Sequence, residues 1–144
     1  MIRQYNSGDV DRVVSIWRAA TALAHSFLSQ EFLALEAENV RHVYPVYAKI
    51  WVKELDGKVV GFVAMNGTEI GGLFLDPACH RQGIGREMVD FMVDKMGLVT
   101  VEVFEANAIG RGFYDGYGFR KTGQYVHEAS GHMTLQMVYQ PGDA

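Results

Sequence analysis

The sequence is poor in cysteine and proline and has no excess of positive charge. Its single cysteine, Cys79, cannot form an internal disulfide, which favours a reducing compartment such as the cytoplasm. The net charge of −4 argues against a general nucleic-acid binder, whose binding face would be basic. No apolar run approaches the ~20 residues of a membrane span, and the first residues lack a signal-peptide pattern. We therefore expect a cytoplasmic monomer or homodimer that binds neither nucleic acid nor membranes.

The length and composition are those of a small folded protein. With 144 residues there is room for one hydrophobic core, so residues 1–144 are predicted to form a single domain. Hydrophobic residues make up 49% of the chain and charged residues 21%, which argues against disorder. The five histidines are scattered and form no spaced cluster with cysteine or aspartate, so no metal site is expected.

Hydrophobic periodicity predicts helices alternating with strands. Ser7 as N-cap and Asp9 as first-turn acid introduce a helix that runs to about His25. A weaker helical pattern ends or bends at Pro45. The predicted strands cover residues 2–5, 50–55, 59–65, 69–75, 98–104, 119–126 and 133–139, and the other predicted helices cover residues 29–44, 84–96 and 107–117. This order predicts an α/β protein with a mixed sheet and helices packed on its faces.

The most informative segment joins the predicted strand 69–75 to the helix that follows. The apolar run Leu73-Phe74-Leu75 meets a proline-containing turn, and Gln82-Gly83-Ile84-Gly85 leads into the helix. The first N–H groups of a helix lack intrahelical acceptors and bind phosphate well, and glycines let an anion approach the main chain. The segment is neither a Walker A motif nor a dinucleotide fingerprint, because it lacks Gly-Lys-Ser/Thr and a third glycine. It predicts a site for a phosphorylated ligand.

Two segments together resemble the GCN5-related N-acetyltransferase (GNAT) family, which moves an acetyl group from acetyl-CoA to an amine. The family's pyrophosphate pattern is Arg or Gln, two residues, Gly, one residue, then Gly or Ala. It aligns with residues 80–85, where His80 departs from it at the first position. The second segment, Asn107 to Phe119, resembles the family's "Asn … Phe-Tyr … Gly-Phe" signature. The resemblance covers nearly the whole chain, and His25-Ser26-Phe27-Leu28 is similar to a bacterial subgroup of small, poorly characterised acetyltransferases.

This resemblance implies a fold, a cosubstrate and a set of contacts. The fold would be a mixed sheet of about seven strands flanked by about four helices, with a splay between the fourth and fifth strands. Acetyl-CoA would be the cosubstrate, without a metal, and the acceptor would be a small-molecule or peptide amine. The residues implied for acetyl-CoA binding are Leu73, Phe74, Leu75, Arg81, Gln82, Gly83, Ile84, Gly85, Arg86, Asn107, Phe113 and Tyr114.

The chemistry calls for an acid and a base. The resemblance makes Tyr114 the acid that protonates the departing thiolate, and the alternative is a tyrosine packed on the sheet. An alkylamine is almost fully protonated at pH 7, so a base or an ordered water must remove a proton. The candidates are His25, then Glu102, then Glu69. His25 would instead cap its helix if it is not the base, and strand glutamates usually face solvent.

Other functions stay open on sequence grounds. A CoA-binding sensor that has lost catalysis is the main alternative, followed by an interaction module with an accidental glycine loop. The sequence does not identify the acceptor, and polyamines, aminoglycosides, amino acids, protein N-termini and lysine side chains all remain candidates. Tyr44, Tyr47 and Trp51 either line an acceptor pocket or, as is commoner for aromatic residues, belong to the core.

Overall fold

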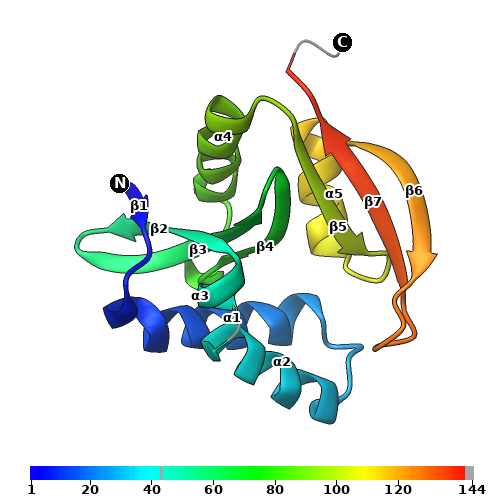
Figure 1. The fold of residues 1–144 in the computed structure, drawn as a ribbon, viewed down its shortest axis with the longest axis horizontal. Helices are drawn as coiled ribbons and strands as arrows, with labels where there is room; N and C mark the ends of the chain where they lie inside the picture. The colour runs from blue at the N-terminus through cyan, green and yellow to red at the C-terminus, as the bar shows by residue number, and fades with distance from the viewer. Residues whose placement is uncertain (43, 142–144) are drawn as a thin grey trace.

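A mixed seven-stranded sheet with the strand order β1-β2-β3-β4-β5-β7-β6 runs through the molecule (Figure 1). This computed structural model describes residues 1–42 and 44–141, and only the backbone of Tyr44 and Tyr47. The strands are β1 (Ile2–Gln4), β2 (Lys49–Leu55), β3 (Lys58–Asn66), β4 (Glu69–Leu75), β5 (Val99–Phe104), β6 (Arg120–Val126) and β7 (Met133–Tyr139). The helices are α1 (Val10–Ala24), α2 (Gln30–His42), α3 (Tyr44–Tyr47), α4 (Ile84–Met96) and α5 (Ala108–Tyr117), with 3-10 turns η1 (Ser7–Asp9) and η2 (Pro77–Cys79). The predicted mixed α/β sheet is confirmed.

The sheet is interrupted between β4 and β5, its only parallel neighbours in the described part of the chain. Pairing there is limited to Glu69 with Thr100 and Ile70 with Val101. Beyond these pairs the strands diverge, whereas β4 continues along β3 as far as Leu75. The splay expected between the fourth and fifth strands is therefore present, and it leaves main-chain groups of both strands without sheet partners across the gap.

Helices cover both faces of the sheet. One core cluster joins α1 and α2 to β2 and β3, with Trp17, Val52 and Phe62 among its buried residues. The other joins α4 and α5 to the opposite face, with Met88 and Tyr114 among its buried residues. Figure 1 shows α1 and α2 below the sheet and α4 above it. A ligand that passes through the splay would therefore contact elements from both layers. None of the described helices is long and apolar enough to cross a membrane.

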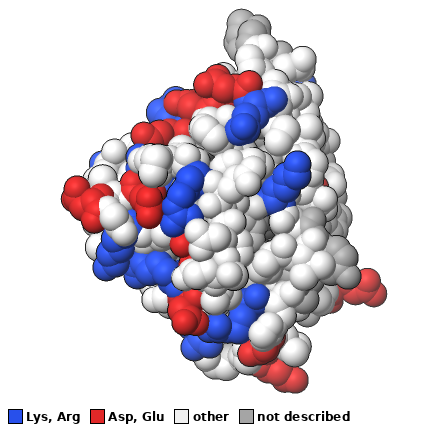
Figure 2. Space-filling view, turned by 60° about the vertical axis from the view of Figure 1, so that its left-hand side comes forward, with Lys and Arg blue, Asp and Glu red and all other residues white. Residues whose placement is uncertain are grey.

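Charged side chains of both signs are mixed on the surface. On the face drawn in Figure 2, Lys and Arg alternate with Asp and Glu, and neither sign forms a continuous patch. Charge alone therefore does not mark this face as a binding surface, because strong electrostatic attraction of a charged ligand or partner requires one sign of charge to dominate.

An arginine on α1 fixes the start of the loop between β4 and α4. Arg12 donates from Nε to the carbonyl of Val59 at 2.7 Å and from Nη2 to Asp76 at 2.8 Å. The same carboxylate accepts the backbone N–H of Ala78 at 3.0 Å. The Ala78 N–H and the Arg12 guanidinium both lower the pKa of Asp76. The loop that leads to α4 is thus attached to both β3 and α1.

One local prediction is wrong. Asn6, rather than Ser7, is the N-cap of the 3-10 turn η1 that leads into α1: its side chain accepts the N–H of Gly8, and Asp9 accepts the N–H of Asn6 in return. The helical pattern changes close to Pro45, as expected: α2 ends at His42, and Pro45 is the second residue of the short helix α3. The first turn of a helix tolerates proline because its N–H groups have no intrahelical acceptor anyway. Residue 43, part of the predicted helix 29–44, lies outside the described residues.

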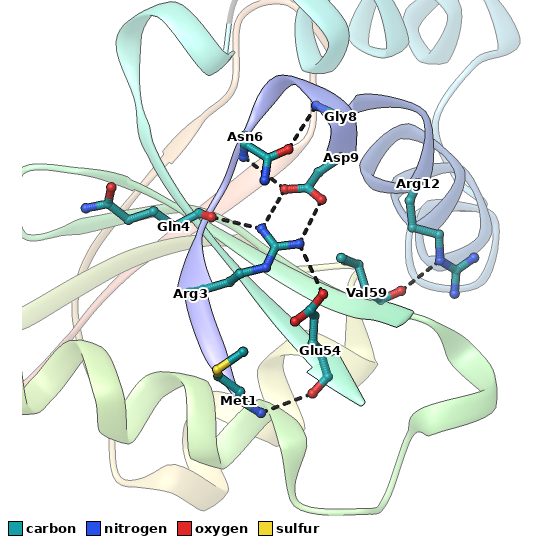
Figure 3. Close-up of polar contacts among 9 residues, drawn as sticks. All are labelled: Met1, Arg3, Gln4, Asn6, Gly8, Asp9, Arg12, Glu54 and Val59. Atoms are coloured by element: carbon teal, nitrogen blue, oxygen red, sulfur yellow. Dashed lines mark hydrogen bonds and ion pairs between the residues drawn. The ribbon is translucent and has the colours of Figure 1, made fainter. Parts of the chain in front are cut away.

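Asp9 also holds the N-terminal strand against the rest of the molecule (Figure 3). Arg3 donates to both of its carboxylate oxygens at 2.9 Å and also reaches Glu54 at 3.3 Å. The hydrogen bonds from Arg3 lower the pKa of the buried Asp9 carboxyl. Through these contacts Arg3 joins β1 to the turn η1 before α1 and to the end of β2.

We expect Asp9→Asn to lower the free energy of unfolding at pH 7 by about 1.5–3 kcal/mol, because it weakens charge-assisted hydrogen bonds in a buried position. The folded pKa of Asp9 is depressed, so its stabilisation is present above the unfolded pKa of about 3.9 and is lost as pH falls through the folded pKa. Urea denaturation should therefore show a large difference in the free energy of unfolding between variant and wild type at pH 7, and a smaller difference at pH 3.

Asp11→Asn provides the matched control for this change. Asp11 pairs with Arg41, but its side chain is 88% exposed, and exposed ion pairs contribute about 0–1 kcal/mol. Equal losses of stability in the two variants, or a gap for Asp9→Asn that does not depend on pH, would contradict the assigned role of Asp9.

Candidate active site

A cavity of about 850 Å³ passes through the splay and brings together segments that are distant in the sequence. Its wall is formed by α1, α2, β4, the loop before α4, the start of α4, β5, α5, β6 and β7. The residues predicted for the site that line it are His25, Glu69, Leu73, Phe74, Leu75, Arg81, Gly83, Ile84, Gly85, Arg86, Glu102, Asn107, Phe113 and Tyr114. Gln82 is exposed on the same loop and lies outside this lining, whereas His80, the departure from the motif, is within it.

The cavity connects the two faces of the sheet. Trp17 and Phe74 on its wall belong to the α1 and α2 side, whereas Ile70 and Tyr114 belong to the α4 and α5 side. Only a break in the sheet allows such a passage, because paired strands leave no opening between them. The cavity is therefore bordered by residues from both faces of the sheet.

One end of the cavity is suited to bind an anion. Arg81 and Gly83 both have a positive φ, 66° and 79°, and the first regular bond of α4 is donated by Glu87 to the carbonyl of Gly83 at 3.0 Å. A non-glycine residue such as Arg81 is strained in this conformation, and turns of this kind gather N–H groups into anion-binding concavities. The N–H groups of residues 84–86 precede the first intrahelical bond and have no acceptor in the helix.

Positive charge lies at the same end. Arg81 is exposed and contributes to the cavity wall. Arg86 also lines the cavity, and its guanidinium stacks over the ring of Tyr117 at 4.8 Å and donates to the carbonyl of Gly116 at 3.4 Å. The charge of Arg86 is thus fixed against α5, near the turn that contains Arg81 and Gly83.

Tyr114 is buried in the wall on the α5 side. Its ring makes edge contacts with Phe113 and Phe119, with centroids 5.2 and 5.1 Å apart. Burial raises the pKa of Tyr114, so the phenol keeps its proton throughout the physiological range. The packing predicted as the alternative role is present, and the residue also lines the cavity, so the two roles are compatible.

The opposite end of the cavity carries carboxylates. Glu69 and Glu102 lie on β4 and β5, on either side of the splay. Burial, followed by the charge of Glu102, raises the pKa of Glu69. A hydrogen bond to Glu102 is the main cause that raises the pKa of Tyr125 to about 12. A bound cation would relieve the repulsion between the two carboxylates, so this end favours a positively charged ligand.

His25 meets Asn107 across the cavity. His25 is the C-cap of α1, and its Nε2 lies 3.1 Å from Nδ2 of Asn107, the N-cap of α5. Asn107 Oδ1 also accepts the N–H of Gly110 at 2.9 Å. Both roles considered for His25, a helix-end residue and a site residue, are compatible with this placement.

Several residues at the carboxylate end were not predicted from the sequence to belong to the site. Phe32, Glu36, Tyr125, His127 and Thr134 line the cavity there. They come from α2, β6, the β6–β7 turn and β7, and no local motif marks them. Thr21 and Thr134 are buried in the lining, and their hydroxyls have no hydrogen-bond partner among the described residues, which adds polar groups to this end.

Trp51, a further candidate whose side chain the structure describes, does not contribute to the cavity wall. Trp51 is buried in the core beside Phe91, as the commoner role of aromatic residues suggested. The side chains of Tyr44 and Tyr47 lie outside the described residues. Within residues 1–42 and 44–141, no group of three His, Cys, Asp or Glu side chains is arranged to hold a metal ion.

Comparisons with known proteins agree on one family. Residues 47–121 match the family described as Acetyltransferase (GNAT) domain. The peptidyl-lysine N-acetyltransferase YjaB of Salmonella typhimurium is 33% identical over 96% of this chain and 97% of its own length. The solution structure of apo-form YjaB from Escherichia coli has a TM-score of 0.89 at 30% identity and covers 96% of both chains. The PaiA N-acetyltransferase of Thermoplasma acidophilum, solved with coenzyme A, shares the fold with a TM-score of 0.76 at 18% identity, over 97% of this chain and 98% of that one.

Proposed function

The chain belongs to the GNAT family of acetyltransferases, and from that premise we propose that it transfers the acetyl group of acetyl-CoA directly to the side-chain amine of a peptidyl lysine. The observation that carries this proposal is the cavity through the splay, with an anion-binding turn at one end and paired carboxylates at the other. The relatives YjaB and YiaC are named peptidyl-lysine N-acetyltransferases.

The residues present fit acetyl-CoA at the α4 end. The free N–H groups at the start of α4, with Arg81 and Arg86 nearby, would hold the pyrophosphate, and Gly83 provides the positive φ of the turn. The pantetheine arm carries amides, which would find partners in the unpaired main chain of β4 and in Asn107. The group supplied by the bound cosubstrate is an activated thioester. A main-chain N–H near the end of β4 would stabilise the negative charge that develops on its oxygen.

The carboxylate end fits an alkylammonium acceptor. A lysine side chain combines a cationic head with an aliphatic stem, and the cavity wall here combines Glu69 and Glu102 with the rings of Phe104, Tyr125 and His127. The carboxylates would attract the cation, and the rings would pack against the stem. This complementarity favours lysine-type amines over neutral or aromatic amines.

The proposed residues handle the protons as follows. A lysine ammonium must lose one proton before it attacks, and Glu102 would pass this proton to solvent, directly or through water. As the carbon–nitrogen bond forms, the carbon–sulfur bond breaks and its electron pair goes to sulfur. Tyr114 would donate its phenolic proton to that sulfur and be reprotonated by the second proton that leaves the nitrogen. The products are an amide and a thiol, and one proton is released.

We further propose that the chain works as one domain, as a monomer or homodimer in the reducing cytoplasm. Both core clusters share a single sheet, and the cavity depends on both of them. The one cysteine, Cys79, is free.

A panel of amine acceptors tests the proposed function. Purified protein should release CoA from acetyl-CoA when lysine peptides are added, and mass spectrometry should locate the acetyl group on the lysine side chain. A peptide with the same sequence and arginine in place of lysine serves as control. Binding of acetyl-CoA by calorimetry without transfer to any amine would contradict the proposal and support the CoA-binding sensor. An absence of CoA binding would exclude both.

A further inference from the structure

A side-chain contact between His25 and Asn107 joins the two helices that flank the splay. His25 ends α1 and Asn107 begins α5, and their side chains meet at 3.1 Å although they are 82 residues apart. The strands on either side of the opening are joined by only two residue pairs. The contact therefore connects the two walls of the cavity where the sheet itself does not.

The orientation of the Asn107 amide decides the role of His25. The N–H of Gly110 donates to Oδ1 of Asn107 at 2.9 Å, so the oxygen must face α5 and Nδ2 must face His25. Exchanging the two amide atoms would place Nδ2–H against the Gly110 N–H, donor against donor. Nε2 of His25 is therefore the acceptor, and the ring proton belongs on Nδ1.

The surroundings keep the His25 ring in this neutral form. Its edge contacts are with the aromatic rings of Phe27 and Phe104, at 5.8 and 5.4 Å. Burial among them lowers the pKa of His25 to about 4. A protonated ring would turn Nε2–H toward the Nδ2–H of Asn107, so protonation would also break the bridge.

We propose that His25 is a positioning residue, not the general base: its Nε2 lone pair holds the Asn107 amide across the splay. A base must have a lone pair free for the incoming proton, and the lone pair of His25 is already bonded. The bridge leaves the second Nδ2–H of Asn107 unused for a carbonyl of a ligand in the cavity that both residues line. This role rests on the proposed binding of acetyl-CoA and predicts an effect on cosubstrate affinity.

The ring tautomer is tested on the unmodified protein. Nitrogen-detected correlation spectra of ¹⁵N-histidine-labelled protein should show Nδ1 protonated and Nε2 unprotonated for His25 between pH 5 and 8. A protonated Nε2 in this range, or a titration of the ring near pH 6–7, would overturn the proposal. This measurement needs neither acceptor nor variant, so its outcome is independent of whether lysine is the acceptor.

Two substitutions test the consequence for binding. His25→Ala should raise the Kd for CoA about 3- to 10-fold, the effect of losing one hydrogen bond that orders the site. His25→Gln offers an amide oxygen at a similar reach and should recover at least half of the loss. His42→Ala, at the exposed end of α2, is the matched control and should bind CoA like wild type.

Kinetics separate positioning from base catalysis. With the best acceptor of the panel, His25→Ala should raise KM for acetyl-CoA more than it lowers kcat, and it should keep the acidic limb of the pH–rate profile. Loss of that limb, or a fall in kcat of about 100-fold without rescue by His25→Gln, would identify His25 as the base and overturn the proposal. Unchanged CoA affinity in both His25 variants would overturn it as well.

Discussion

Replacing Tyr114 with phenylalanine is expected to lower kcat at least about tenfold while leaving the affinity for acetyl-CoA nearly intact. Phenylalanine keeps the ring that packs between Phe113 and Phe119, so the variant removes little beyond the hydroxyl. That hydroxyl is the proposed proton donor to the sulfur. Without it, the carbon–sulfur bond must break with a higher activation free energy. Steady-state kinetics and calorimetry with CoA measure the two effects separately.

The raised pKa of Tyr114 is compatible with this role. Because its pKa is raised, the phenol of Tyr114 stays protonated and is available as a proton donor. Proton transfer from it to a thiolate in water would be unfavourable, because the pKa of a thiol is lower than that of the phenol. The thiolate here would form within the same buried cavity, where desolvation raises its pKa too. The two groups therefore stay closer in proton affinity than their values in water suggest.

Tyr117→Phe is the matched control on the same helix. Its hydroxyl donates to Asp90 at 2.6 Å on the surface side of α5, and Tyr117 is not part of the cavity wall. Its kcat should equal that of wild type. An unchanged rate in Tyr114→Phe would remove this residue from the mechanism, and equal losses in both tyrosine variants would point to a general weakening of α5.

Sequence patterns predicted the turns and helix ends whose conformation depends on neighbouring residues. The pair Asp56-Gly57, between the predicted strands 50–55 and 59–65, is typical of a two-residue hairpin turn, and both residues have the positive φ, 54° and 77°, that such a turn requires. The glycines after α4 and α5 likewise end their helices, at Gly97 and Gly118. The N-terminal cap was missed because Asn6 and Ser7 are both good caps, and the choice depends on Asp9, which Arg3 holds from another strand.

The site could be predicted only along its continuous segments. The turn before α4 and the start of α5 each consist of a short continuous segment with a sequence motif, and both line the cavity. The contact of His25 with Asn107 and the hydrogen bond from Tyr125 to Glu102 depend on strand and helix packing over long sequence separations. No periodicity or motif encodes such pairs. The sequence therefore pointed to the cosubstrate more clearly than to the acceptor.

The second large effect is expected at Glu102. Glu102→Gln should lower kcat with a lysine peptide about 100-fold, the usual range for loss of a general base, with little change in CoA affinity. The variant keeps the shape of the side chain and an acceptor for the Tyr125 hydroxyl, so the loss reports on the carboxylate itself. Glu69→Gln should act differently, raising KM for the acceptor about 3- to 10-fold through the lost attraction to its charge.

The pH dependence of Glu102→Gln distinguishes a base from a merely charged wall. Burial and the charge of Glu102 raise the pKa of Glu69, so removing that charge should lower it again. Any residual activity that depends on ionised Glu69 should then extend to lower pH than in wild type. Glu105→Gln, an exposed change just past the end of β5, should leave both the rate and the pH–rate profile unaltered.

A Glu102→Gln variant with wild-type kcat at pH 7 would mean that solvent, or another group, takes the proton. The carboxylate pair would then serve only to attract the acceptor, and the loss should appear in KM alone.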